Sequence, residues 1–473
     1  MTNTRDAFIY REIYNRLRSG ILTGQMKSGE RLPSTRTLAA RIGVSRNSVL
    51  AAMDQLTSEG FLESRAGSGT FVSESLTRLT PTTSRLAGKL SRRGKLIETT
   101  AVSRQRLATG FVPFTPGLPD LNRLPMAQFG RILSRQTRLL SPEAFSYGQA
   151  GGWQPLREAV ALYLRMARGV VCDTDQVLIV SGSQACLDLC ARVLFDPGDT
   201  IGTEDPGYLG ARGAFLSAGL RIAPLQVDED GLVVSQLRRQ RGIRGIYVTP
   251  SHQFPLGVTM SLARRLELVQ LAERQNLWII EDDYDSEYRF HGKPLSALQG
   301  LDRTGRVIYT GTFSKVLFPG LRIGYIVVPR NAVAAFAQCH ALAARHAPIL
   351  EQAALAEFMK SGGFYRHVRQ MRSLYKERQS ILVDESRKLK GLIDVSPCEA
   401  GMQLVGWLTK STRDGGKLLS AKAAQIGLDL APVSDYALKP QDRTGFLLGY
   451  SGFGSAEIKR GMGLLERVLK DNR

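Results

Sequence analysis

Apolar residues recur at helical spacing near the start of the chain. The stretch 8–22 repeats an apolar side chain every three or four positions, which predicts an amphipathic helix. A Gly- and Pro-containing turn follows, and Ser34 and Ser45 are each placed to cap a further helix. The stretch 61–72 predicts two short strands around a Gly-containing loop. Three helices followed by a hairpin predict a winged helix-turn-helix domain over residues 1–75. The apolar face of the first helix holds Ile9, Ile13, Leu17 and Ile21.

Residues 76–111 have no firm periodicity and an excess of basic side chains. Between positions 77 and 106 the chain holds eight Lys or Arg against one Glu, with few aromatic residues. This composition favours a partly mobile linker whose cations follow a DNA phosphate backbone. A solvated tether that contacts nothing is an equally good interpretation.

From residue 112 the pattern changes to continuous apolar runs that alternate with helical stretches. Runs such as QVLIVSG, NLWIIEDD and RIGYIVVP are typical of strands buried on both faces of a parallel sheet. Helical stretches such as SLARRLELVQLAERQN separate them, which predicts an α/β domain over 112–473. From about residue 355, long helices and short strands predict a smaller α+β subdomain. The expected chain is therefore multidomain.

The composition adds a strong positive charge to this picture. Of 473 residues, 43% are hydrophobic and 22% charged, and the formal net charge is +20. The charge favours an anionic partner, nucleic acid first, although an unpartnered basic surface fits it too. Five widely spaced cysteines without zinc-site spacing favour reduced core residues and no metal site. The polar N-terminus and the absence of a long apolar stretch predict a cytoplasmic protein that does not enter a membrane.

The third predicted helix begins with the sequence SRNS. In a helix-turn-helix the start of this helix meets base edges in the major groove, where hydroxyl, guanidinium and amide groups bond bases or phosphates. The preceding helix and the hairpin tip RAGSG offer further cations and backbone N–H groups. Singly, each of these residues would more often be a solvated surface group. Together they predict contacts to double-stranded DNA from Arg36, Ser45, Arg46, Asn47, Ser48, Arg65, Gly67, Ser68 and Gly69.

The stretch TGTFSKVLFPGLRIGY sets Lys315 directly after an apolar strand. A lysine that forms a Schiff base must be desolvated or flanked by a cation, so that its amine is neutral and nucleophilic. Thr312 and Arg322 nearby are the groups that a cofactor phosphate needs. In the upstream sequence WIIEDDYDSEY, Asp282 is our choice for the acid that pyridoxal phosphate requires at its ring nitrogen, with Tyr284 reaching the ring hydroxyl.

Two further clusters fit the same cofactor. The sequence SGSQ ends a strand and starts a helix, where backbone N–H groups and the helix dipole attract an anion, so Ser183 and Gln184 are candidate phosphate ligands. Tyr208 in the sequence EDPGY is an aromatic that stacks on a pyridine ring. Each feature alone has a simpler explanation: a helix cap, a solvated loop, or a lysine that reaches the surface. Their order along an α/β chain favours the cofactor site.

Residues 8–72 resemble the winged-helix domain of the GntR superfamily of bacterial transcription factors. From residue 112 the chain resembles fold type I aminotransferases, through YGQAGGWQPLREAVALYL, SGSQACLDL, EDDYDSEYRF and TFSKVLFPGLRIGY. The combination resembles the MocR/GabR subfamily. It implies a pyridoxal 5′-phosphate-dependent regulator whose Lys315 carries the cofactor as an internal aldimine and senses an amine or amino-acid-like effector. It also implies a homodimer, often domain-swapped, with Tyr147 reaching across the dimer interface toward the phosphate.

Two departures from the aminotransferase pattern matter. Phe254 stands where catalytic aminotransferases have an asparagine that tunes the ring hydroxyl, with His252 or Gln253 as partial substitutes. Leu447 stands where they keep an arginine for the substrate carboxylate, although Arg443 lies nearby. Two alternatives to an amine-sensing regulator stay open: an active aminotransferase with an appended DNA-binding domain, and a regulator that senses pyridoxal phosphate itself.

Overall fold

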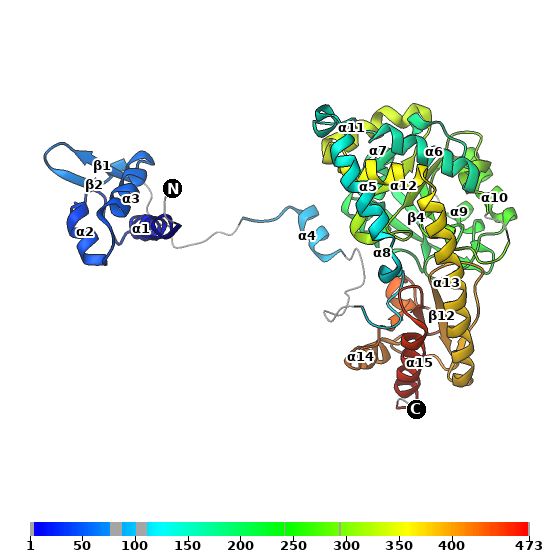
Figure 1. Ribbon diagram of the computed structural model, residues 1–473. Helices are drawn as coiled ribbons and strands as arrows, with labels where there is room; N and C mark the ends of the chain where they lie inside the picture. Colours follow the sequence, from blue (N-terminus) through cyan, green and yellow to red (C-terminus); the bar gives the residue numbers. More distant parts are fainter. Residues whose placement is uncertain (1–3, 76–87, 101–110, 241, 293–294, 472–473) are drawn as a thin grey trace. The chain divides into compact units, whose positions relative to one another are not determined.

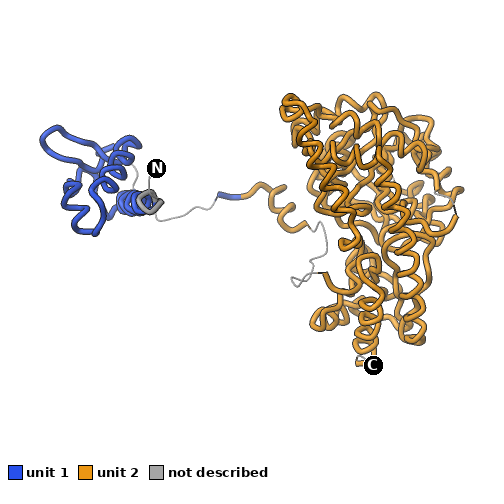
Figure 2. The backbone as a smooth tube through the Cα atoms, in the orientation of Figure 1, with its two compact units in different colours: residues 1–89 blue, residues 90–473 orange. Residues whose placement is uncertain are grey.

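The chain forms two compact units, each with its own core. The structure, a computed structural model, describes residues 4–75, 88–100, 111–240, 242–292 and 295–471. The first unit is Met1–Lys89 and the second is Leu90–Arg473 (Figure 2).

Unit 1 confirms the predicted winged helix-turn-helix (Figure 1). Ser34 and Ser45 are N-caps, as expected: their hydroxyls accept hydrogen bonds from the backbone N–H of Thr37 at 3.2 Å and of Ser48 at 3.1 Å. The apolar faces of all three helices and both strands pack into one core that includes Ile13, Leu17, Val49 and Leu62. The elements are α1 Thr4–Leu22, α2 Thr35–Ile42, α3 Arg46–Ser58, β1 Leu62–Arg65 and β2 Gly69–Val72.

Part of the stretch expected to be a linker is a helix that packs on unit 2. Helix α4, Arg92–Thr99, begins at the N-cap Ser91 and lies against α8, Leu209–Ser217. The Nε of Arg93 donates a hydrogen bond to the carbonyl oxygen of Ser217 at 2.6 Å. Short helices of low apolar content give little periodicity, which is why the sequence pattern did not predict this one. The rest of the predicted linker, 76–87 and 101–110, lies outside the described residues.

Unit 2 is built on an eight-stranded sheet with the order β3-β10-β9-β8-β7-β4-β5-β6. Strands β9, β8, β7, β4 and β5 are parallel neighbours, and β10 is antiparallel to β3 and β9. Strands β4, β8 and β9 are buried runs, as their sequences predicted, whereas β5 is only partly buried. The strands are β3 Val177–Val180, β4 Thr200–Asp205, β5 Arg221–Asp228, β6 Gly231–Leu232, β7 Ile243–Val248, β8 Trp278–Asp283, β9 Val307–Thr312 and β10 Gly324–Val327.

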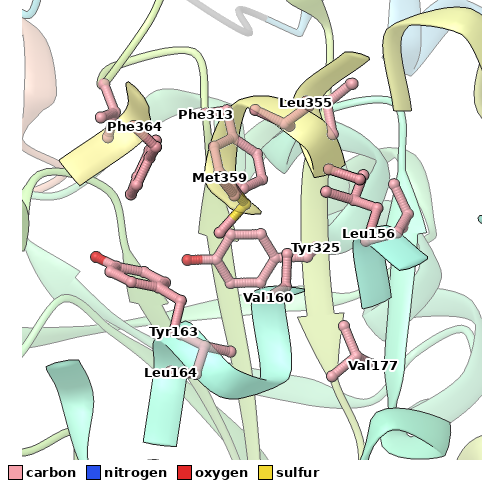
Figure 3. Packing of buried hydrophobic residues seen from close by; sticks show 14 of the residues in the cluster. Leu156, Val160, Tyr163, Leu164, Val177, Phe313, Tyr325, Leu355, Met359 and Phe364 are labelled. Carbon is pink, nitrogen blue, oxygen red and sulfur yellow. The ribbon is translucent and has the colours of Figure 1, made fainter. Parts of the chain in front are cut away.

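Helices cover both faces of this sheet. Helices α7, α8 and α11 pack on one face, and α6, α10 and α12 pack on the other. Figure 3 shows the core between the sheet and helices α6 and α12, where Tyr163 of α6 and Met359 of α12 converge on Tyr325 of β10. Besides α8, the helices that flank the two faces of the sheet are α5 Met126–Leu139, α6 Gln154–Arg168, α7 Ser183–Leu194, α9 Ser235–Arg239, α10 Leu262–Gln275, α11 Val333–Ala344 and α12 Ile349–Lys360.

A smaller α+β subdomain ends the chain, as predicted. Its antiparallel sheet has the order β11-β12-β14-β13 and packs with three helices around a separate core. None of the described helices is both long and apolar enough to span a bilayer, and the described residues hold no cluster of metal ligands. The elements are α13 Gly363–Ser386, β11 Ile393–Val395, β12 Gln403–Leu408, α14 Lys417–Gln425, β13 Ala431–Pro432, β14 Gly445–Gly449 and α15 Ser455–Lys470.

Candidate functional site

A cavity of about 270 Å³ in unit 2 brings together most of the predicted cofactor residues. One wall comes from the carboxyl ends of parallel strands and the segments that follow them, where α/β proteins bind ligands. The other wall comes from the C-terminal subdomain, through residues such as Met402, Gln403, Asp429 and Tyr436. The predicted residues that line the cavity are Ser183, Tyr208, Asp282, Tyr284, Thr312, Lys315 and Arg322.

Lys315 lies just past the end of β9, within the cavity lining. Its Nζ donates a hydrogen bond to the carbonyl oxygen of Gly117 at 2.8 Å. Gly117 has φ of +64°, and a Cβ at this position would lie 3.0 Å from Nζ, so a side chain would press on the amine. The backbone of the 117 segment therefore holds the lysine amine inside the cavity.

Arg322 and the start of α7 form an anion-binding corner. Arg322 adopts φ of +52° and donates from Nη2 to the carbonyl oxygen of Ser181 at 3.0 Å. A Cβ on Gly182 would lie 3.3 Å from the guanidinium, so the glycine lets the arginine approach the helix. Ser183 is the first residue of α7, where free backbone N–H groups and the dipole favour negative charge.

Asp282 is the buried acid of the site. Its Oδ2 accepts a hydrogen bond from the hydroxyl of Tyr247 at 2.7 Å, and the hydroxyl of Thr310 donates to Oδ1 at 3.3 Å. Burial raises the pKa of Asp282 to about 6, against the lowering effect of the Tyr247 bond. The next residue, Asp283, points to the opposite face of the sheet, as strand alternation requires, and pairs with Arg168 at 2.7 Å.

Tyr284 belongs to a second polar group at the cavity wall. Its hydroxyl lies 2.9 Å from Nδ1 of His252, which also lies 2.9 Å from Oδ2 of Asp285. Burial alone would lower the pKa of His252, but the Asp285 carboxylate raises it to about 10, so the ring is cationic at neutral pH. This ion pair fixes the imidazole against the Tyr284 hydroxyl.

Phe254 occupies the place expected from the sequence, inside the cavity lining. Its ring packs edge-on against Tyr208 at 5.7 Å and Tyr436 at 5.3 Å between ring centroids. The Gln253 amide instead donates to the carbonyl oxygen of Pro206 at 2.9 Å. Of the two expected substitutes for the asparagine, His252 is therefore the one that reaches Tyr284.

Two predicted cofactor residues do not line the cavity. The Gln184 amide donates to the carbonyl oxygen of Gly210 at 3.0 Å and so ties α7 to α8. Tyr147 is 85% exposed, and the Arg345 guanidinium lies over its ring at 5.5 Å. The order of motifs along the sequence does not show whether a side chain points into an anion-binding site or lies next to it.

The lining also includes polar residues that the sequence motifs did not indicate, among them Tyr247, Asp285, Gln403 and Asp429. Tyr247 sits one residue before the end of β7, and strand alternation would have set it on the Asp282 face. Gln403 and Asp429 carried no local signal, because the subdomain brings them to the cavity from far along the chain.

The residues of unit 1 that we predicted to contact DNA divide into exposed side chains and side chains that already make contacts within the unit. Arg36, Arg46 and Asn47 are exposed, and Nε of Arg46 donates to the Thr35 hydroxyl at 3.3 Å. Ser45 is exposed, but its hydroxyl serves as the α3 N-cap. The wing tip, with Gly67, Ser68 and Gly69, is exposed, and its glycines have φ of +74° and +111°.

Ser48 and Arg65 differ from the expectation. Ser48 is only 6% exposed, and its hydroxyl lies 2.8 Å from that of Ser45 at the start of α3. Arg65 pairs with Glu74 at 2.7 Å and lies over the Phe71 ring at 4.8 Å. The predicted DNA contacts of Ser48 and Arg65 therefore compete with contacts that both residues already make within unit 1.

The donor set of the cavity fits pyridoxal phosphate. A buried carboxylate, a lysine amine, an aromatic side chain, and an arginine beside a helix start border one space, and Oδ1 of Asp282 accepts a long hydrogen bond of 3.3 Å from Thr310. Each would suit a different part of that cofactor: ring nitrogen, aldehyde, ring face and phosphate.

Comparison with known proteins gives a family match for each of the two units. The family "Bacterial regulatory proteins, gntR family" matches residues 9–72, and "Aminotransferase class I and II" matches residues 121–426. The probable rhizopine catabolism regulatory protein MocR of Rhizobium meliloti is 41% identical over 98% of this chain and 94% of its own length. The HTH-type transcriptional regulator TauR of Rhodobacter capsulatus is 31% identical over 95% and 94%, respectively.

A solved aminotransferase has the fold of unit 2. The crystal structure of Pyrococcus horikoshii kynurenine aminotransferase, in complex with PMP, superposes with a TM-score of 0.71 at 26% identity, covering 84% of this chain and 99% of that one. The chain therefore belongs to the MocR type of GntR-family transcriptional regulators, in which a winged helix-turn-helix precedes a pyridoxal-phosphate-dependent, aminotransferase-like domain.

Proposed function

We propose that this regulator changes its binding to operator DNA when an amine or amino-acid-like effector enters the unit 2 cavity and engages the cofactor at Lys315. The observation that carries the proposal is that Lys315 and Asp282 border one cavity in a chain that also has a winged helix. The names of the MocR and TauR relatives support regulation as the outcome. Operator binding implies that the protein acts in the cytoplasm.

When bound, pyridoxal phosphate supplies an aldehyde that combines reversibly with amines. In our proposal Lys315 holds the cofactor and gives it up to the effector amine. Arg322, Ser183 and Thr312 bind the phosphate, since all three line the cavity and Ser183 begins α7. Gln184 supports this corner by fixing α7 to α8.

Asp282 keeps a proton at the ring nitrogen, and Tyr247 positions its carboxylate through the 2.7 Å hydrogen bond. Tyr284 donates to the ring hydroxyl and is itself held by the His252–Asp285 pair. Tyr208 covers the ring face. These roles follow from donor type and from which residues line the cavity.

We also propose that the functional state is a homodimer, with the DNA-binding unit exchanged between subunits. Tyr147 is 85% exposed, as a side chain that reaches a partner subunit's phosphate must be in the isolated chain.

We expect regulation and not turnover to be the main role. Phe254 puts an apolar side chain where catalytic aminotransferases keep an asparagine amide. The hydroxyl of the cofactor ring therefore lacks a hydrogen-bond donor that favours proton transfer. An active aminotransferase and a sensor of pyridoxal phosphate itself remain the two alternatives that the experiment must distinguish.

The test is an absorbance spectrum of the full-length protein loaded with cofactor, beside the Lys315→Ala variant, during titration with amines. Binding to duplexes selected from random sequences is followed in the same samples. We expect a visible band that depends on Lys315, that one amine shifts, and that changes DNA affinity without keto product. Steady product formation would favour the aminotransferase, and a band that no amine shifts would favour a cofactor sensor.

A further inference from the structure

Unit 2 contains a second cavity, of about 210 Å³, that shares no lining residue with the cofactor cavity. It lies between α6, the short helix η5 Ser286–Tyr288 and the first turns of α13. Tyr163 of α6 and Phe364 of α13, whose rings pack edge-on at 5.4 Å between centroids, belong to its apolar wall (Figure 3). The charged side chains of the lining are Arg168, Glu287, Arg369 and Arg372.

The Glu287 carboxylate borders this cavity and forms no salt bridge with a described residue. Its Oε1 accepts a hydrogen bond from the Tyr163 hydroxyl at 2.8 Å. The Arg168 guanidinium in the same lining is already used, because it pairs with Asp283 at 2.7 Å and donates to two further acceptors. Burial and the neighbouring Asp283 charge raise the pKa of Glu287 to about 7. A cationic group in the cavity would compensate the charged form of this carboxylate.

Two arginines of α13 bring positive charge to the same cavity. Arg369 and Arg372 are three positions apart, so their side chains are neighbours on the helix surface. The Nε of Arg372 donates to the backbone carbonyl oxygen of Glu287 at 2.8 Å, which fixes this guanidinium beside η5. The other N–H groups of the two guanidiniums bond to no described residue. Guanidiniums with unused donors bind carboxylates well, because two N–H groups can meet the two oxygens.

The charges of the lining indicate which ligand fits the cavity. A simple anion would meet the arginines but would also approach the Glu287 carboxylate, and a simple amine would leave the guanidiniums unused. An α-amino acid carries an ammonium and a carboxylate on one carbon, so it satisfies both sets of groups. The wall formed by Tyr163 and Phe364 suits an apolar side chain.

We propose that this cavity is a second binding site, which takes an α-amino acid with an apolar side chain. Glu287 binds the ammonium group, and Arg369 and Arg372 bind the carboxylate. The site uses no residue of the cofactor cavity, so the inference does not depend on the proposed function. It gives the regulator a ligand besides the one that engages Lys315.

The position of the site connects it to both walls of the cofactor cavity. Helix η5 follows the segment that carries Asp282 and Tyr284, and α13 leads into the subdomain that contributes Gln403. An amino acid bound between η5 and α13 therefore ties these two parts of unit 2 together.

Isothermal titration calorimetry on the full-length, cofactor-loaded protein and on full-length Lys315→Ala tests the site. The probes are L-leucine, L-leucinamide, which lacks the carboxylate, and N-acetyl-L-leucine, which lacks the ammonium group. We expect leucine to bind at least about tenfold more tightly than either analogue, and to bind Lys315→Ala equally well. The absence of leucine binding, or equal binding of either analogue, would overturn the proposal. Loss of binding in Lys315→Ala would also overturn it, because leucine would then bind in the cofactor cavity.

Two variants identify the side chains responsible. Glu287→Gln keeps an acceptor for the Tyr163 hydroxyl but removes the charge, so the preference for leucine over N-acetyl-leucine should fall to nearly 1. Arg369→Met should weaken leucine by at least about tenfold while leucinamide binds as before. Arg366→Met is the matched control, because Arg366 is exposed on the same helix and does not line the cavity. An equal loss in Arg366→Met and Arg369→Met would contradict the assignment.

Thermal unfolding gives a readout that does not depend on the heat of binding. Leucine at about 100 times its Kd should raise the Tm of the native protein by about 2–4 °C and leave that of Glu287→Gln nearly unchanged. Without leucine, Glu287→Gln should unfold at the native Tm or above it, since it loses a buried charge that has no cation partner among the described residues. The same leucine-induced rise in Tm for both proteins would overturn the proposal.

Discussion

The two functional surfaces of this regulator are built in opposite ways. On unit 1, Arg46 and Asn47 are neighbours in sequence and exposed, and the α3 cap sets their position. In unit 2, Gly117, Lys315 and Gln403 come from distant parts of the chain to one partly enclosed cavity. The first surface depends on local helix geometry and screened charge, whereas the second depends on burial and on the whole fold. Substitutions should therefore affect the two surfaces separately.

The largest expected effect is that of Lys315→Ala on the cofactor. Without the amine, the covalent attachment that we propose cannot form, so the visible band should disappear completely. The winged helix has its own core, so DNA binding without effector should stay measurable. Absorbance spectroscopy and fluorescence anisotropy on one sample test both statements. A variant that keeps the band would remove Lys315 from the site.

Asp282→Asn should weaken cofactor binding by roughly 100-fold or more, because removing one partner of a buried ion pair costs about 3 kcal/mol. Equilibrium dialysis measures the affinity. Asp283→Asn is the comparison variant: its carboxylate pairs with Arg168 on the opposite face of the sheet, so it should lower Tm more than cofactor affinity. Equal losses of affinity in both variants would contradict the assignment of Asp282.

Acidification should reproduce part of this loss in the native protein. Asp282 has a raised pKa of about 6 before the cofactor binds, and it is neutral below that pH. The neutral acid cannot pair with a protonated ring nitrogen, so affinity should fall by about tenfold per pH unit below pH 6. The ratio of native to Asp282→Asn affinity, measured from pH 5 to 8, isolates this group. A ratio that does not change with pH would show that another group controls binding.

On unit 1 the expected effects are smaller and depend on salt. Arg46→Ala should weaken operator binding by about tenfold and leave the cofactor band unchanged, since Arg46 is exposed at the start of α3. Ser48→Ala should instead lower stability by about 1 kcal/mol with little direct effect on recognition, because Ser48 packs in the N-cap. Anisotropy across a salt series and thermal unfolding distinguish the two. A larger loss of operator affinity for Ser48→Ala would restore it as a contact residue.

The same contrast explains how much the sequence predicted. Local signals specified the winged helix, both N-caps and the buried strands, because caps and periodicity act over a few residues. Motif order also predicted Lys315, Asp282 and Arg322 at one cavity. Gln403 and Asp429 escaped prediction because tertiary packing alone brings them there. The burial of Ser48 was also not predicted, because hydroxyls at a helix start serve both caps and DNA contacts.

The smallest effect tests whether the two surfaces communicate. Helix α8 begins next to Tyr208 at the cavity and ends at Ser217, whose carbonyl accepts from Arg93 of α4. Arg93→Ala should therefore reduce the effector-induced change in operator affinity by a factor of about 2–5, at constant cofactor affinity. Lys95→Ala is the control, because it removes one positive charge from the same helix. If α4 only contacts DNA phosphates, both variants should reduce the salt dependence of operator binding equally. A lower effector response in Arg93→Ala alone would assign α4 to the signal path, and equal behaviour of the two variants would assign it to DNA.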